Sequence, residues 1–238
     1  MCPKIALAGK TLLTLSDDPA VTIKALSPSD AGFVAAVAQL RSVPAPTEGA
    51  AKLRPPKINT NDASVVISVR VGQEELLLLG ADLEERGSPN LGWQAVVGDW
   101  SLSNGKHKVF KVPHHGSSNG HLNEVWEKML VRDATCIVTS FVHGNSVVPE
   151  RQDCERLASL TKHAFLTTHP SRGKFKTQNR AISRIIQDYT RSFCELGSKF
   201  GHVRVRRDLR GSPEWVCSRL GAALPINTSF IASLRNWC

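Results

Sequence analysis

The chain has 238 residues, of which 41% are hydrophobic and 21% are charged, so it is long enough to bury a sizeable core and has an ordinary globular composition. No stretch of about 18 apolar residues occurs, which excludes a membrane-spanning helix. The start of the chain is too short and too interrupted for a secretion signal, and the six cysteines are scattered without a CxxC pair. We therefore expect reduced thiols, a cytoplasmic location and no membrane partner.

The first part of the chain predicts strands and one helix. Residues 1–19 have no clear pattern, while residues 21–26 alternate with a β-branched bias that is typical of a strand. Ser27-Pro28-Ser29-Asp30 is an N-cap signature and predicts a helix over 31–41. Residues 42–58 hold four prolines and no periodicity, so we expect a loop there.

The remainder predicts alternating strands and helices. A β-rich run over 64–71 and an apolar run over 76–79 flank a turn and predict a hairpin, and residues 84–106 are expected to form a polar excursion. Further expected elements are helices over 122–131, 153–160 and 178–194, strands over 134–141 and 164–168, and a last hairpin over 203–206 and 214–217. This order predicts an α/β protein with a mixed sheet over 20–170, and residues 171–238 complete the same domain.

The net charge of +9 is concentrated near the end of the chain. Residues 172–210 contain eleven Lys or Arg and three Asp or Glu. Such a segment is typical of contact with a polyanion such as nucleic acid, and Arg204, Arg206 and Arg207 are the candidate binding residues. A solvated helix face is the common alternative.

Two predicted strands end in residues that bind metals. Residues 75–79 form an apolar run followed by Gly80-Ala81-Asp82, and residues 109–112 lead through Pro113 into His114 and His115. A carboxylate and an imidazole at neighbouring strand ends suit a divalent ion such as zinc. Taken singly, Asp82 could be a turn or N-cap residue and the histidines could be plain loop residues.

Four motifs occur in a fixed order. They are Asn61-Asp62-Ala63-Ser64 before a hairpin, Leu79-Gly80-Ala81-Asp82, Lys111-Val112-Pro113-His114-His115-Gly116-Ser117, and Ser140 to Asn145 followed by Pro149 and a helix. Over residues 20–170 this order resembles the carboxyl-terminal half of metallo-β-lactamase-fold hydrolases of the ComEC-like kind, which occur in DNA-internalisation competence proteins.

The resemblance implies an αββα sandwich and a metal-dependent hydrolase, with one or two zinc or manganese ions that activate water to attack a phosphodiester or related ester, nucleic acid among them. It implies that Asp82 is the metal-bridging, catalytic carboxylate, that His115 is a metal ligand, and that His114 donates to the developing oxyanion. The motifs also make Asn61, Ser64, Ser117 and Asn145 candidate substrate-binding residues.

One motif of that family is absent. Its amino-terminal half carries His-x-His-x-Asp-His, and the first histidine of this sequence is His107. We therefore expect a sandwich that lacks its amino-terminal half, in a chain that is truncated, completed by a second polypeptide, or degenerate. Such a chain should be weakly active or inactive alone, and should expose a large apolar patch or bind a subunit that covers it. The alternative is a catalytically inactive module that binds a polyanion or another subunit.

Overall fold

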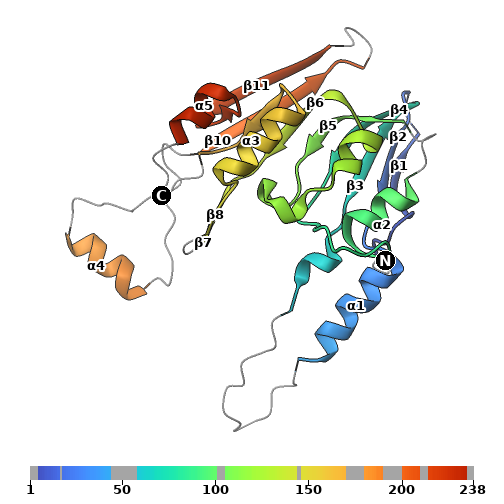
Figure 1. The fold of residues 1–238 in the computed structure, drawn as a ribbon, viewed down its shortest axis with the longest axis horizontal. Helices are drawn as coiled ribbons and strands as arrows, with labels where there is room; N and C mark the ends of the chain where they lie inside the picture. The colour runs from blue at the N-terminus through green and yellow to red at the C-terminus, as the bar shows by residue number, and fades with distance from the viewer. Residues whose placement is uncertain are drawn as a thin grey trace.

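An eight-stranded mixed sheet organises the chain in the computed structural model (Figure 1), which describes residues 5–16, 18–43, 58–100, 105–143, 146–169, 180–189, 200–209 and 214–234. The strand order is β1-β2-β3-β4-β5-β6-β9-β12. The mixed α/β class predicted from the sequence is confirmed. Among the described residues, no helix combines the length and apolar character needed to cross a bilayer.

The first four strands form an antiparallel meander. They are β1 (Thr11–Leu15), β2 (Val21–Ala25), β3 (Ile67–Val71) and β4 (Glu74–Leu79). Gly72 makes the β3–β4 turn with a φ of 59°, a conformation that glycine adopts without strain. Between β2 and β3 lie helix α1 (Asp30–Arg41), whose N-cap Ser29 accepts a hydrogen bond from the Gly32 amide, and the 3-10 turn η1 (Thr60–Ala63).

The second half of the sheet is mostly parallel. β5 (His107–Lys111), β6 (Leu130–Val138) and β9 (Ala164–Leu166) follow β4 in parallel, and β12 (Leu224–Pro225) closes the edge antiparallel to β9. Parallel neighbours need crossover connections: helix α2 (Gly92–Asp99) lies between β4 and β5, and helix α3 (Arg151–Leu160) lies between β6 and β9. Both helices lie on the viewer's side of the sheet in Figure 1.

The remaining elements lie outside this sheet. They are the short π-helical turn η5 (Val125–Met129), the hairpin β7 (Phe141–His143) with β8 (Ser146–Val148), helix α4 (Arg180–Tyr189), the hairpin β10 (Gly201–Arg207) with β11 (Trp215–Gly221), and helix α5 (Thr228–Ser233).

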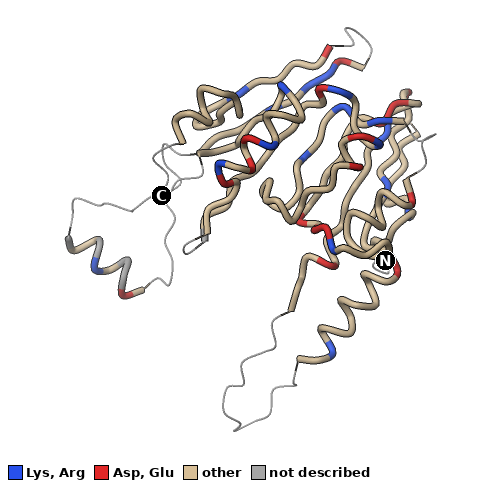
Figure 2. The backbone as a smooth tube through the Cα atoms, in the orientation of Figure 1, with Lys and Arg blue, Asp and Glu red and all other residues tan. Residues whose placement is uncertain are grey.

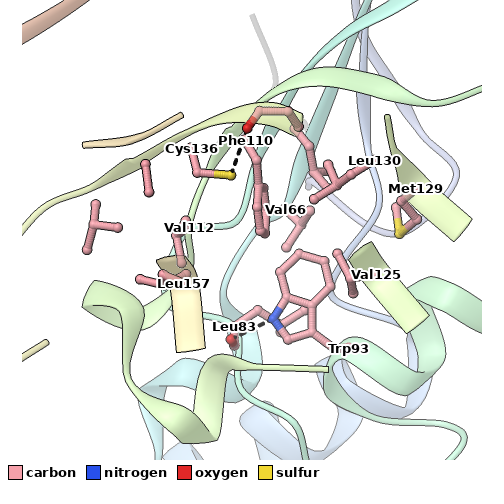
Figure 3. Close-up of a cluster of buried hydrophobic side chains, with 14 of the residues drawn as sticks. Val66, Leu83, Trp93, Phe110, Val112, Val125, Met129, Leu130, Cys136 and Leu157 are labelled. Atoms are coloured by element: carbon pink, nitrogen blue, oxygen red, sulfur yellow. Dashed lines mark hydrogen bonds between the residues drawn. The ribbon is translucent and has the colours of Figure 1, made fainter. Parts of the chain in front are cut away.

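The hydrophobic core lies on one face of the sheet, beneath α2, α3, α5 and η5. Trp93 of α2 is fully buried and meets Phe110 of β5 edge to face, with ring centroids 6.2 Å apart. Its indole Nε1 donates to the Leu83 carbonyl at 2.9 Å, which fixes the loop after β4 to the core (Figure 3). The core therefore holds in place the loop that carries Asp82.

The structure differs from the sequence prediction at two places. The expected polar excursion over 84–106 contains α2. Its first residue must be glycine, because Gly92 has a φ of 59° and a Cβ there would lie 2.1 Å from the Glu84 carbonyl oxygen. The helix expected over 122–131 is present but shorter: the helical stretch covers 123–129, its last five residues form the π-helical turn η5, and β6 already begins at Leu130. Short apolar runs do not distinguish a buried strand from a helix by periodicity alone.

Candidate functional site

The loops after β4 and β5 are hydrogen-bonded to each other at the end of the sheet where these two strands terminate. The Gly80 amide donates to the Lys111 carbonyl at 3.0 Å, and the His114 amide donates to the Ala81 carbonyl at 3.1 Å. A Cβ on Gly80 would lie 2.9 Å from the Lys111 carbonyl oxygen, so this close approach requires glycine. The two loops that carry Asp82 and the histidines are thereby held as one unit.

Asp82 and His115 face each other at this edge. His115 Nε2 lies 3.8 Å from Asp82 Oδ1, while His115 Nδ1 lies 2.8 Å from the carbonyl oxygen of Thr139. Because a carbonyl only accepts hydrogen bonds, Nδ1 carries a proton, which leaves Nε2, on the Asp82 side of the ring, as the nitrogen that could bind a metal. Two ligands of one tetrahedral zinc ion are about 3.4 Å apart, so the two atoms are separated by roughly the distance that a shared ion needs.

The His115 ring is also fixed from the side. It stacks on Phe141 of β7 with ring centroids 4.9 Å apart and an interplanar angle of 25°. A backbone carbonyl that orients a metal-binding histidine is a common feature of metal sites, because it selects the tautomer and the ring orientation. His115 is therefore held in an orientation that suits a ligand.

Backbone strain is concentrated at the same place. Among the described residues, four that are not glycine have a positive φ, and three of them are Ala81 (47°), His114 (43°) and His115 (55°). Left-handed backbone at such residues costs roughly 1 to 3 kcal/mol each and persists where the surroundings enforce it, often at functional sites. The fold thus sustains local strain to present these side chains.

Glu84, which the sequence analysis did not single out, links several predicted residues. Its Oε1 accepts a hydrogen bond of 2.8 Å from Asn61 Nδ2 and lies 3.4 Å from His114 Nδ1. His114 Nδ1 is buried and forms no hydrogen bond. It is therefore close enough to Glu84 for an ion pair, but the two groups are not aligned for a hydrogen bond. Arg86 also reaches Glu84, at 3.3 Å. Figure 2 shows acidic positions close together at this edge of the sheet.

Lys111 adds a positive charge beside the predicted ligands. It precedes the histidine motif, and its Nζ donates to the Val112 carbonyl at 2.9 Å. Burial lowers the pKa of Lys111 from its ordinary value, and the charge of Asp82 partly opposes that effect. Its place in the Lys-Val-Pro-His-His run was the signal that could have identified it.

The other predicted site residues take different places. Ser117 lies beside the histidines, where its amide donates to the His114 carbonyl at 3.0 Å. The Ser64 carbonyl accepts from Ser27 Oγ at 2.6 Å, which gives Ser64 a structural contact. Asn145 lies outside the described residues. Within the described part of the chain, no three His, Cys, Asp or Glu side chains converge as a metal site.

The three candidate polyanion-binding arginines do not share one surface. In β10, Arg204 and Arg206 point to one face of the hairpin and Arg207 to the other, because side chains alternate along a strand. Arg207 forms a bidentate contact with Glu74 and lies 5.8 Å from the centroid of the Trp215 ring. Arg207 is therefore engaged within the fold. Residues 172–179, 190–199 and 210 of the basic segment lie outside the described residues.

A buried Ser-His-Glu cluster lies on the core face of the sheet. Ser68 Oγ is 2.8 Å from both His107 Nε2 and Glu75 Oε2, and His107 Nδ1 is 2.9 Å from the Met129 carbonyl oxygen. With one proton, Ser68 donates to only one of its two partners at a time. All three residues are buried, at 4%, 0% and 9% exposure for Ser68, His107 and Glu75, so no substrate reaches the serine and the cluster is structural.

The buried imidazole of His107 predicts acid sensitivity. Desolvation lowers its pKa from 6.5 to about 4, and the hydrogen bond to Met129 offsets only part of that effect. The unfolded chain therefore binds a proton at higher pH than the folded chain, and this contribution to stability is complete above pH 6.5 and is lost as the pH falls toward 4. The loss amounts to about 3 kcal/mol.

Chemical denaturation between pH 7.5 and 4 checks this expectation. His107→Gln, whose amide can both donate to Met129 and accept from Ser68, should flatten the pH dependence, while the exposed control His163→Gln should leave it unchanged. An unaltered slope in His107→Gln would show that other groups cause the acid sensitivity.

No family model matches the chain, and neither a curated protein nor a solved structure shows significant similarity to it.

Proposed function

We propose that this chain carries part of the active site of a metal-dependent hydrolase that acts on a phosphodiester or related ester, nucleic acid included. The observation that supports this most directly is the pair Asp82 and His115. One imidazole nitrogen is occupied by the Thr139 carbonyl, and the other lies 3.8 Å from the Asp82 carboxylate. An aspartate and a neutral histidine in this arrangement are ligands that zinc or manganese accepts.

Each neighbouring residue has a role in this proposal. A bound ion would polarise the phosphoryl oxygen and lower the pKa of a coordinated water toward neutrality. Asp82 and His115 would hold that ion, His114 would donate a hydrogen bond to the oxyanion, and Lys111 would contribute positive charge for an anionic substrate. Asn61 and Arg86 orient Glu84, which in turn lies against His114.

Two ligands make an incomplete site. Zinc usually takes four ligands, of which a catalytic centre provides three from protein. The motif order that resembles ComEC-like metallo-β-lactamase-fold hydrolases supports the proposal that the remaining ligands come from polypeptide outside this sequence. The isolated chain is accordingly proposed to bind metal and to hydrolyse substrate weakly.

The test is a metal titration of the purified chain. Isothermal titration with zinc and with manganese at pH 7.5 should show one weak site that a chelator reverses, and a generic phosphodiester and single-stranded DNA should be cleaved slowly, in a metal-dependent manner. No metal uptake, together with salt-sensitive DNA binding that Arg204→Glu and Arg206→Glu abolish, would contradict the hydrolase and support a polyanion-binding module.

A further inference from the structure

The face of the sheet opposite the core, here called the second face, is apolar along β1 to β4. Strand register places Leu13, Ile23, Val69 and Leu77 side by side on this face, because residues paired across strands point the same way. The alternation along each strand adds further residues, so that the apolar set of the second face is Leu13, Leu15, Val21, Ile23, Ile67, Val69, Leu77 and Leu79.

The opposite side of the same strands is polar. Lys24 pairs with Ser68 and Thr22 pairs with Arg70, and these residues point toward the side that carries the core. An antiparallel sheet with one wet face normally directs its polar residues to water and its apolar residues to a packed layer. The alternation therefore indicates that the second face of β1 to β3 is built to be covered.

This apolar set is incompletely covered by the described residues. Leu13, Leu15 and Leu79 are 44%, 43% and 37% exposed, and the other five side chains are partly exposed. None of the eight belongs to the core cluster. A contiguous apolar surface of this kind is typical of an interaction site.

The hairpin β10–β11 contacts the second face at the start of β4. Glu74 pairs with Val71 on this face, and Arg207 of β10 reaches Glu74 from the inner side of the hairpin. Val203, on the same side of the hairpin as Arg207, is 9% exposed, and Val109 of β5 is 4% exposed although it lies outside the core cluster. The hairpin thus begins a second layer of strands on this side of the sheet.

A second copy of the chain fits this surface poorly. The outer face of the hairpin carries Arg204 and Arg206 beside Val216 and Leu220. Because sheets pack about 10 Å apart, two copies meeting at their second faces would press these arginines against an apolar surface or hold the faces apart. Within the described residues β10 and β11 pair only with each other. The outer edge of each strand therefore presents backbone N–H and C=O groups that could hydrogen-bond with a further strand.

We propose that the second face binds a strand-forming segment of a partner polypeptide, which adds to an edge of β10–β11 and lays its apolar side on β1 to β3. The partner segment has alternating apolar and polar residues, because only one of its faces is buried in the resulting sheet-on-sheet packing. This proposal is argued from the residue pattern and register of the strands, and it does not depend on the metal chemistry proposed above.

The test begins with site-specific photocrosslinking in cells of the natural source. A benzoylphenylalanine at position 13 lies on the second face, and the matched control at position 14 lies on the opposite face of the same strand. Position 13 should give an adduct with a different polypeptide, crosslinked through a segment of alternating pattern, and position 14 should not. The purified partner should then bind the wild-type chain, with Leu13→Glu weakening binding at least about tenfold and Thr14→Glu leaving it unchanged.

Three outcomes would overturn the proposal. An adduct of the chain with itself, matched by a dimer in light scattering, would assign the second face to a second copy. A partner whose affinity is the same for wild type and Leu13→Glu would dock elsewhere. No adduct at position 13, together with no binding of the apolar dye ANS by the purified chain, would show that the second face is not an exposed apolar surface and binds no partner. If His115 variants lose metal binding but still bind the partner, the metal site and the docking surface are independent of each other.

Discussion

His115→Ala is expected to weaken zinc binding by the chain about a hundredfold or more. The substitution removes one of the two ligands that the structure brings together, and it leaves Asp82 as an exposed carboxylate with little affinity of its own. Competition with a chromogenic chelator at pH 7.5 measures the change. Asp82→Asn should cause a loss of similar size, because it removes the charge and keeps the shape.

His121→Ala is the matched control. His121 lies a few residues along the same loop, but its Nε2 contacts the Asn123 side chain at 2.8 Å, and none of the ion pairs among the described residues joins it to Asp82. Zinc affinity should therefore be unchanged. Equal losses in the His115 and His121 variants would indicate adventitious binding to surface histidines, and the assignment of the site would be wrong.

Trp93→Ala is expected to lower the free energy of unfolding by about 3 to 5 kcal/mol, because it opens a large cavity between α2 and the sheet. Trp93 has no exposed surface, packs on Phe110 and donates a hydrogen bond to Leu83. Equilibrium denaturation in urea gives the change from the shift in midpoint at constant slope.

Trp93→Phe separates packing from the hydrogen bond. It retains most of the ring but leaves the Leu83 carbonyl without its indole donor, which should cost about 1 to 3 kcal/mol. Because Leu83 follows Asp82, this variant should also loosen the loop, and zinc affinity should fall more than in a core variant such as Leu157→Ala of comparable stability. An unchanged zinc affinity would show that the loop is held by its contacts with residues 111–119 alone.

The sequence predicted the strand ends of the site because its signals there are local. An apolar run that ends in Gly-Ala-Asp, and a second that ends in Pro-His-His-Gly, place Asp82 and His115 at strand termini without reference to the rest of the fold. The partners of these residues could not be predicted in this way. Thr139 approaches His115 only because β6 lies beside β5. Glu84 could be assigned to the site only from its contacts with Asn61 and His114 in the fold.

Other features of the fold depend on distant contacts that the sequence does not indicate. Arg207 belonged to a basic run in the sequence, but Glu74, far away along the chain, engages it in the fold. Helix α2 was missed because glycine and proline surround it, while its core-facing residues Trp93, Val96 and Val97 form too short a pattern to indicate a helix. Local periodicity contains no information about such pairings.

The short strand β12 has a consequence for the order in which the sheet is completed during synthesis. β9 ends at Leu166, and the strand that pairs with its outer side begins only at Leu224. A ribosome that has released β9 must therefore translate nearly sixty further residues before that edge is closed. For that interval the nascent chain presents an open strand edge to its surroundings, and a chain terminated before Leu224 would keep that edge as a template for misassembly.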